Sequence, residues 1–134
     1  MKTTELVVQT ARRRGLFDLT EACAEFVAGE GDGLLSVFAP HATAGLVIAE
    51  LGAGSDSDLV AALDRLLPRD GRYVHRHGSP GHGADHLVSL VASPSLTIPV
   101  VEGRTALGRW QSIALLDPNQ DNSTRTVRLS FLPG

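Results

Sequence analysis

The sequence predicts an α+β fold, a compact sandwich of mostly antiparallel or mixed sheet with two main helices. Three observations support this expectation. Apolar runs of strand length recur along the chain, two segments place apolar residues at helical spacing, and Gly, Pro, Asn and Asp separate the runs. The length of 134 residues suits one domain with a buried core, so we expect a single domain over residues 1–134.

A strand and a helix are the first expected elements. Residues 3–11 alternate enough to form a strand, and a helix is expected in the stretch that follows Asp18. The apolar stripe of this helix consists of Ala22, Cys23, Phe26 and Val27. Gly29 is a natural stop. Cys23 therefore falls on the buried side, and we interpret it as a packing residue rather than a nucleophile.

The middle of the chain predicts two further strands and a second helix. Residues 33–40 and 43–51 are strongly apolar, and the short connection between them holds His41. The loop GAGSDSD leads into the helix, which the sequence PRDG ends. One face of this helix consists of Leu59, Val60, Leu63, Leu66 and Leu67.

The C-terminal part predicts a run of strands. Residues 86–92 and 95–101 are apolar, and Glu102 and Gly103 suggest a tight hairpin turn. Residues 105–117 would then return antiparallel, and residues 124–132 alternate as a final strand. Strands this rich in Val, Leu and Ile need a second layer or another subunit to cover them.

Composition excludes several classes of function. The net charge is −3, so we expect no nucleic-acid partner. No apolar run approaches the roughly 18 residues of a membrane span, and the N-terminal residues lack the apolar core of a signal peptide. The single cysteine cannot form an internal disulfide. These features are typical of a cytoplasmic protein without a membrane partner.

Four of the five histidines lie in the stretch YVHRHGSPGHGADHLVSLV, residues 73–91. His75 and His77 share one face if that segment is extended, whereas Gly81 and Gly83 argue against a helix between His82 and His86. Imidazole suits zinc and similar divalent metals, and three histidines with an open position are typical of a catalytic metal site.

Two interpretations of these histidines stay open. In the first, His41, His75 and His86 assemble a metal site, with His82 undecided as a fourth ligand. In the second, they lie on a polar surface loop and never meet. Asp85 is adjacent to His86 and is able to ligate or orient it, although alternation points the two side chains apart.

Other polar residues are candidates for catalysis or anion binding. Glu50 follows the strand after His41 and is a candidate general base or histidine-orienting carboxylate, against a plain surface role. Thr43 and Gly45 in ATAGL offer a hydroxyl and backbone N–H groups for an anion, against a tight turn. The arginines of GRTALGRWQS are candidate phosphate ligands, against solvated side chains; they are Arg104 and Arg109.

Three segments resemble the YjbQ family: GDGLLSVFAPHATAGLVIAE, YVHRH and, above all, HLVSLVASPSLTIPVVEGRTALGRWQSIAL. Family sequences run close to HTSAGLTINE and SLTIPVxxGRLxLGTWQGI at the corresponding places. The resemblance covers almost the whole chain, from Leu6 to about Arg128. It implies a compact α+β fold, a homotrimer, and a metal-like site formed by His41, His75 and His86, with Glu50 matching the family glutamate.

The resemblance also implies an activity, because some members are described as secondary thiamine-phosphate synthases, which join a pyrimidine diphosphate to a thiazole phosphate. This chain departs from the family pattern in places. Ala42 replaces a threonine, and HGSPGHGAD stands where members have a segment close to EGDDNAPAH. LLDPN stands in place of CEHR, with Asp117 as a shifted substitute for the glutamate.

Three functions follow as hypotheses. The first is an enzyme in which a divalent metal, zinc or similar, on His41, His75 and His86 binds a phosphorylated small molecule, with His41 and Glu50 as catalytic groups. Pyrophosphate chemistry normally uses Mg²⁺, which prefers oxygen ligands, and this mismatch weakens the thiamine assignment. The second is a non-catalytic trimer that holds a metal or a small anion. The third is a structural module in which the histidines are incidental.

Overall fold

The computed structural model describes residues 1–75 and 78–134, and its fold is α+β, as the sequence predicts. In chain order the elements are β1 (Lys2–Gln9), β2 (Gly15–Asp18), α1 (Thr20–Val27), β3 (Gly33–Phe38), β4 (Gly45–Ala49), α2 (Ser55–Leu66), α3 (His82–Asp85), a 3-10 helix (Val88–Leu90), β5 (Ser95–Val101), β6 (Arg104–Thr105), β7 (Ser112–Asp117) and β8 (Thr124–Pro133).

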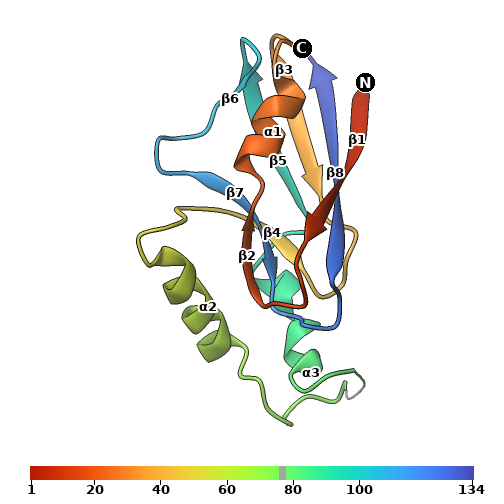
Figure 1. Cartoon of the computed structure of the whole chain (residues 1–134), viewed down its shortest axis with the longest axis vertical. Helices are drawn as coiled ribbons and strands as arrows, with labels where there is room; N and C mark the ends of the chain where they lie inside the picture. Colours follow the sequence, from red (N-terminus) through yellow and green to blue (C-terminus); the bar gives the residue numbers. More distant parts are fainter. Residues whose placement is uncertain (76–77) are drawn as a thin grey trace.

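The strands form two antiparallel sheets in the described part of the chain (Figure 1). The larger has the order β1-β8-β3-β5-β6, and the smaller has the order β2-β7-β4. In the larger sheet, Leu35 of β3 pairs with Ile98 on one side and with Phe131 on the other. All three side chains are buried, because alternate residues of each strand face the same side.

The smaller sheet is the middle of three layers. Leu46 of β4 and Leu115 of β7 join the main core, which includes the inner face of the larger sheet and residues of α1. The next residues in each strand, Val47 and Leu116, pack on the opposite side with Leu63 of α2. Because both of its faces are covered, β7 is buried over nearly its whole length.

The expected strand over residues 86–92 is wrong. The segment instead forms the end of a helical turn followed by the 3-10 helix. Val88 and Ala92 lie four residues apart, and both pack with Leu63 and Leu116 in the smaller core cluster. Their spacing suits one face of a helical segment, so this face is buried without a neighbouring strand, whereas Leu90 and Val91 stay exposed.

The hairpin expected around residues 102 and 103 is present, but its second strand is shorter than predicted. Glu102 and Gly103 form the predicted two-residue turn with φ of 51° and 72°, and Val101 pairs with Arg104. The antiparallel return to β5 is limited to β6, however, and residues 112–117 join the other sheet. A turn in which the Gly108 N–H donates to Gln111 Oε1 (2.8 Å) separates the two segments.

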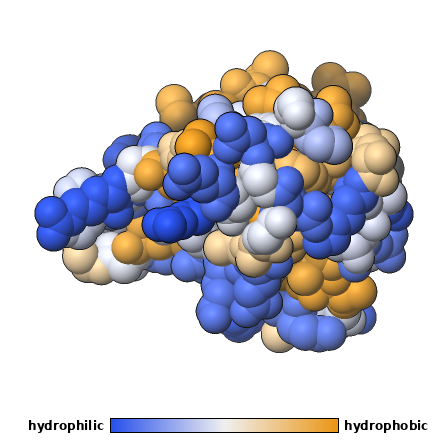
Figure 2. Space-filling model, turned by 90° about the horizontal axis from the view of Figure 1, so that it is seen from above, coloured by the Kyte–Doolittle hydropathy of each residue, from blue (hydrophilic) through white to orange (hydrophobic). Residues whose placement is uncertain are grey.

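One short strand was missed, and some apolar surface stays exposed. The four-residue β2 pairs with β7 and is too short to show a period in the sequence. Figure 2 shows hydrophobic residues between hydrophilic ones on the face seen from above. Within residues 1–75 and 78–134, no helix is long and apolar enough to cross a membrane.

Candidate metal centre

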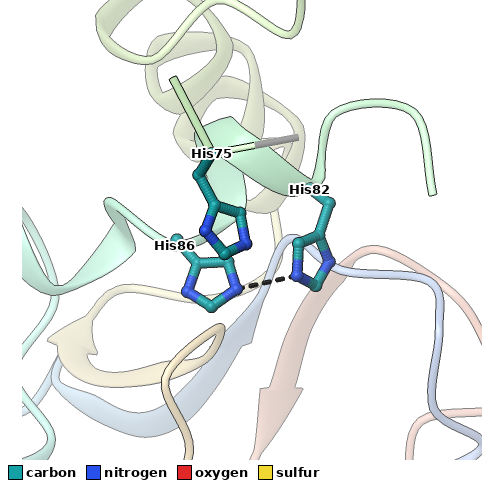
Figure 3. Close-up of side chains that lie close together, drawn as sticks. All are labelled: His75, His82 and His86. Carbon is teal, nitrogen blue, oxygen red and sulfur yellow. Dashed lines mark hydrogen bonds between the residues drawn. The ribbon is translucent and has the colours of Figure 1, made fainter. Parts of the chain in front are cut away.

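Three histidines gather beside α3 (Figure 3). His75 lies in the connection between α2 and α3, His82 is the first residue of α3, and His86 follows its last residue. The His86 N–H donates to the His82 carbonyl at 3.1 Å, so the two side chains project from successive turns on one face. The expectation that Gly81 and Gly83 prevent a helix here is wrong, because Gly81 adopts φ of 88° just before the helix begins.

The three imidazole rings are close enough to share one ligand. The distance between His82 Nε2 and His86 Nε2 is 2.7 Å. The ring centroid of His75 lies 4.0 Å from that of His86 and 5.3 Å from that of His82. One nitrogen from each ring lies within 4.8 Å of the other two, and each side chain is partly buried.

The structure brings together His75 and His86 of the sequence-based set, but adds His82 in place of His41. His41 follows β3, which lies between β8 and β5, and its Nε2 lies 2.9 Å from the carbonyl oxygen and 3.2 Å from the nitrogen of Thr126 in β8. His41 is not part of the three-histidine group. His77 lies outside the described residues.

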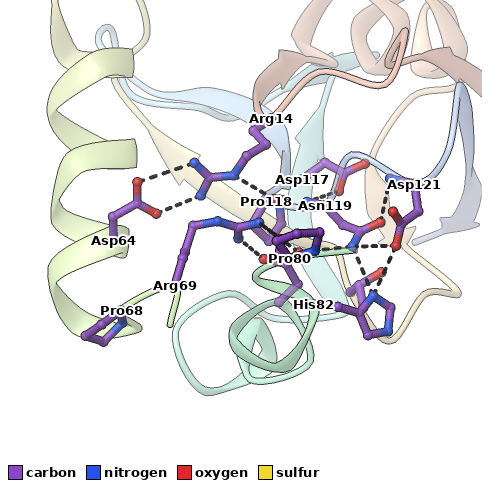
Figure 4. Close-up of polar contacts among 12 residues, drawn as sticks. Arg14, Asp64, Pro68, Arg69, Pro80, His82, Asp117, Pro118, Asn119 and Asp121 are labelled. Atoms are coloured by element: carbon purple, nitrogen blue, oxygen red, sulfur yellow. Dashed lines mark hydrogen bonds and ion pairs between the residues drawn. The ribbon is translucent and has the colours of Figure 1, made fainter. Parts of the chain in front are cut away.

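Polar side chains from the loop after β7 surround His82 (Figure 4). His82 Nδ1 lies 3.1 Å from Asp121 Oδ2 and 3.2 Å from Asn119 Nδ2. Asn119 is 1% exposed, and its Nδ2 also lies 3.0 Å from Asp85 Oδ2. The loop thus joins His82 to a buried network of polar groups.

Asp85, the candidate to ligate or orient His86, pairs with Arg69. Its carboxylate is fully buried and accepts hydrogen bonds from the Arg69 guanidinium and from Asn119. Arg69 also donates to the Pro80 carbonyl at 3.2 Å. A cavity of about 420 Å³ opens beside these groups, lined by Arg69, Tyr73, His75, His82 and the glycines between them. The histidines therefore lie at the wall of a space large enough for a small molecule.

A second buried network contains Asp117 and Thr43. Arg125 forms a bidentate pair with Asp117 at 2.7 and 3.0 Å, and its Nη2 donates to Thr43 Oγ1 at 2.9 Å. Asp117 also accepts from the backbone N–H of Asn119 at 3.0 Å, so it supports the start of the loop that carries Asn119 and Asp121.

The remaining candidate residues lie in other places. Glu50 is exposed directly after β4. Gly45 is buried in β4, where an added Cβ would lie 2.8 Å from Ala92 Cβ, so its missing side chain permits close packing. Arg104 is in β6, at the end of the molecule opposite α3 (Figure 1), and the exposed Arg109 stacks over Trp110. None of them belongs to the three-histidine group.

The donor set fits a transition metal better than magnesium. Three imidazole nitrogens suit zinc and similar ions, with a fourth position left for a ligand. Tetrahedral zinc, with Zn–N bonds of about 2.0–2.1 Å, holds two ligand nitrogens about 3.3 Å apart. The nitrogens of His82 and His86 would therefore separate by about 0.6 Å from their 2.7 Å contact to take such an ion.

Sequence reasoning missed Asn119 and Asp121, and it left His82 undecided. The i, i+4 spacing of His82 and His86 was the available signal. No local pattern connects His82 with residues nearly forty positions later, because that contact depends on how the loop after β7 folds.

Comparisons with known proteins agree with this architecture. The family model described as UPF0047 protein YjbQ-like matches residues 4–134. A UPF0047 protein of Mycobacterium tuberculosis is 60% identical over 134 residues, covering all of both chains. A UPF0047 protein of Archaeoglobus fulgidus is 32% identical, covering 92% of this chain and 96% of its own. The crystal structure of a hypothetical protein from Aeropyrum pernix has a TM-score of 0.89 at 32% identity and covers both chains fully.

Proposed function

The chain belongs to the YjbQ-like UPF0047 family, and from that premise we propose that it binds a divalent transition metal ion through His75, His82 and His86. The observation that carries this proposal is the convergence of three imidazoles, with one nitrogen of each within 4.8 Å of the others. Burying such rings together is favourable when a cation is their common ligand.

We further propose that the bound ion recognises a phosphorylated small molecule. Three neutral imidazoles would leave the full charge of a divalent ion in place, and such a charge attracts phosphate oxygens. The 420 Å³ cavity lies directly beside His75 and His82, which supports an arrangement in which the ligand reaches the open coordination position. A divalent ion there would polarise a phosphoryl oxygen.

This chain's own groups would position that ligand. Arg69 lines the cavity while Asp85 holds its guanidinium, so it presents a fixed cation rather than a mobile one. Arg104 and Arg109 were the candidate phosphate ligands, but neither lines this cavity. Secondary thiamine-phosphate synthase activity is the finer enzymatic hypothesis, and a cytoplasmic location, consistent with the free Cys23, belongs to the same proposal.

Elemental analysis of the purified, untagged protein tests the metal. We expect about one zinc or similar ion per chain in the wild type and a loss in His86→Ala. His41→Ala is the matched control, since it removes a histidine outside the cluster. Thermal unfolding of each variant checks that it is folded.

The outcomes separate the alternatives. A wild type that takes up no metal, even after incubation with zinc, would contradict the proposal. Loss of metal in His41→Ala but not in His86→Ala would overturn the choice of ligands. Metal binding without formation of thiamine phosphate from pyrimidine diphosphate and thiazole phosphate would favour a non-catalytic binding protein.

A further inference from the structure

We infer that Asp121 is a positioning residue that fixes the ring of His82 for metal binding, and that Asn119 in turn fixes Asp121. The inference rests on the proposed function and extends it to the loop after β7. Asp121 Oδ2 lies 3.1 Å from His82 Nδ1, within hydrogen-bond distance.

The orientation of the Asn119 amide follows from its contacts. Its Oδ1 accepts the Asp121 backbone N–H at 2.9 Å, so its Nδ2 faces the opposite way. Nδ2 has two hydrogens, and two carboxylate oxygens lie within reach: Asp85 Oδ2 at 3.0 Å and Asp121 Oδ2 at 3.2 Å. Asn119 therefore donates to both carboxylates and bridges them.

This bridge points to the nitrogen of His82 that carries hydrogen. We assign both hydrogens of Asn119 Nδ2 to the two carboxylates, which leaves His82 Nδ1, 3.2 Å from Nδ2, to donate rather than to accept. His82 Nδ1–H donates to Asp121 Oδ2, and His82 Nε2 keeps its lone pair for the cluster. His86 Nε2, 2.7 Å away, is then the donor to His82 Nε2.

The surroundings of Asp121 keep it an acceptor. Its Oδ2 lies within hydrogen-bond distance of two nitrogens, Asn119 Nδ2 at 3.2 Å and His82 Nδ1 at 3.1 Å. An ionised carboxylate on the far nitrogen of a ligand histidine increases the basicity of the ligating nitrogen and holds the ring in place. Loss of such a partner typically costs 10–100-fold in metal affinity.

The first test needs no metal. Long-range ¹H–¹⁵N correlation spectra of the metal-free protein report which ring nitrogen of a histidine is protonated. We expect His82, assigned by comparison with His82→Ala, to show a protonated Nδ1 and an unprotonated Nε2, and Asp121→Ala to lose this preference. A wild-type His82 that carries its hydrogen on Nε2 would overturn the inference, whether or not metal binds.

The second test is zinc affinity, measured by competition with a chelating dye. We expect Asp121→Ala to bind about 10–100-fold more weakly than wild type, and Asp121→Asn, which keeps an acceptor but not the charge, to fall between them. Asp64→Ala is the matched control: the Asp64 side chain is 38% exposed against 35% for Asp121, and it pairs with Arg14 rather than with a histidine. We expect wild-type affinity for it.

The two tests separate a failure of the Asp121 role from a failure of the metal site. Wild-type affinity in Asp121→Ala, with metal bound by the wild-type protein, would refute the role of Asp121 and leave the metal site standing. No binding by any variant would refute the metal site, and the nitrogen spectra would still decide whether Asp121 fixes His82. An equal loss in Asp64→Ala would reduce the effect to general destabilisation and would count against the inference.

Discussion

At the scale of single residues, burial determines the reactivity of the Cys23 thiol. The side chain lies on the inner side of α1 with no exposed surface, in the same core cluster as Val27 and Leu35. Burial, and secondarily the negative charge of Asp18, raises the pKa of the Cys23 thiol from 9.0 to about 12. The thiolate is the reactive form, so the structure agrees with packing rather than nucleophilic chemistry.

We predict that Cys23 is inert in the native protein. At pH 8 a disulfide reagent such as DTNB should label it far more slowly than in guanidinium chloride, where the thiol is exposed. Labelling of the native protein at the rate of a free thiol would contradict this expectation. The folded pKa is the higher one, so the free energy of unfolding should fall as the pH rises from about 9 toward 12, because only the unfolded thiol ionises there.

Two of the three histidines in the cluster could be predicted from the sequence, and the third could not. His75 and His86 were expected to lie close together, and both belong to the three-histidine cluster, because a short connection and a helical turn bring them together. His41 was included in the set from its place in the sequence, and the family resemblance implied it too, but it lies instead against Thr126 in β8. Which histidine completes the group depends on the packing of the glycine-rich connection, and local spacing does not determine that packing.

At the scale of elements, the spacing of apolar residues explains which strands and helices could be predicted and which segment was mistaken for a strand. Periodicity identified β5, β8 and α2, whose apolar residues alternate or follow one face. Residues 86–92 form a short apolar run, and such runs suit either a buried strand or a helical turn. Contacts with Leu63 and Leu116, which come from distant parts of the chain, favour the helical conformation here.

Gly83 controls how closely the connection that carries His75 approaches α3. An added Cβ would lie 2.8 Å from the His75 carbonyl oxygen and 3.0 Å from Tyr73 Cβ. Alanine would otherwise favour a helix by about 1 kcal/mol over glycine. Here the contact should outweigh that preference, because the atoms met are a backbone oxygen and a Cβ that cannot rotate away.

We therefore predict that Gly83→Ala destabilises the protein by about 1–3 kcal/mol, as overpacking does, and weakens zinc binding by displacing His75. Chemical denaturation and dye competition would measure the two effects. Gly71→Ala is the control, since an added Cβ there meets nothing within 4 Å, and it should be neutral or slightly stabilising. Unchanged stability and affinity in Gly83→Ala would show that the connection can shift at little cost.

At the scale of the whole molecule, the larger sheet presents one face to solvent. Leu34 of β3 pairs with Pro99 of β5 and with Leu132 of β8, so the three form a row across the sheet. Leu34 is 45% exposed, Leu132 is 47% exposed, and Val101, near Pro99, is 53% exposed. The view in Figure 2, from the end where both termini lie, shows hydrophobic surface among hydrophilic residues. Apolar side chains gathered on a sheet face favour contact with another chain.

We propose that this face joins copies of the chain, with a homotrimer as the expected assembly. Light scattering coupled to size-exclusion chromatography should give three times the chain mass of 14.1 kDa. Leu34→Glu should shift the protein toward monomer, because it places a charge in the middle of the row and would bury it on association. Leu66→Glu is the control, a substitution of an even more exposed leucine, at 66%, on the distant helix α2. A wild type that elutes as a monomer would contradict the assembly, and a trimer that persists in Leu34→Glu but dissociates in Leu66→Glu would move the interface to α2.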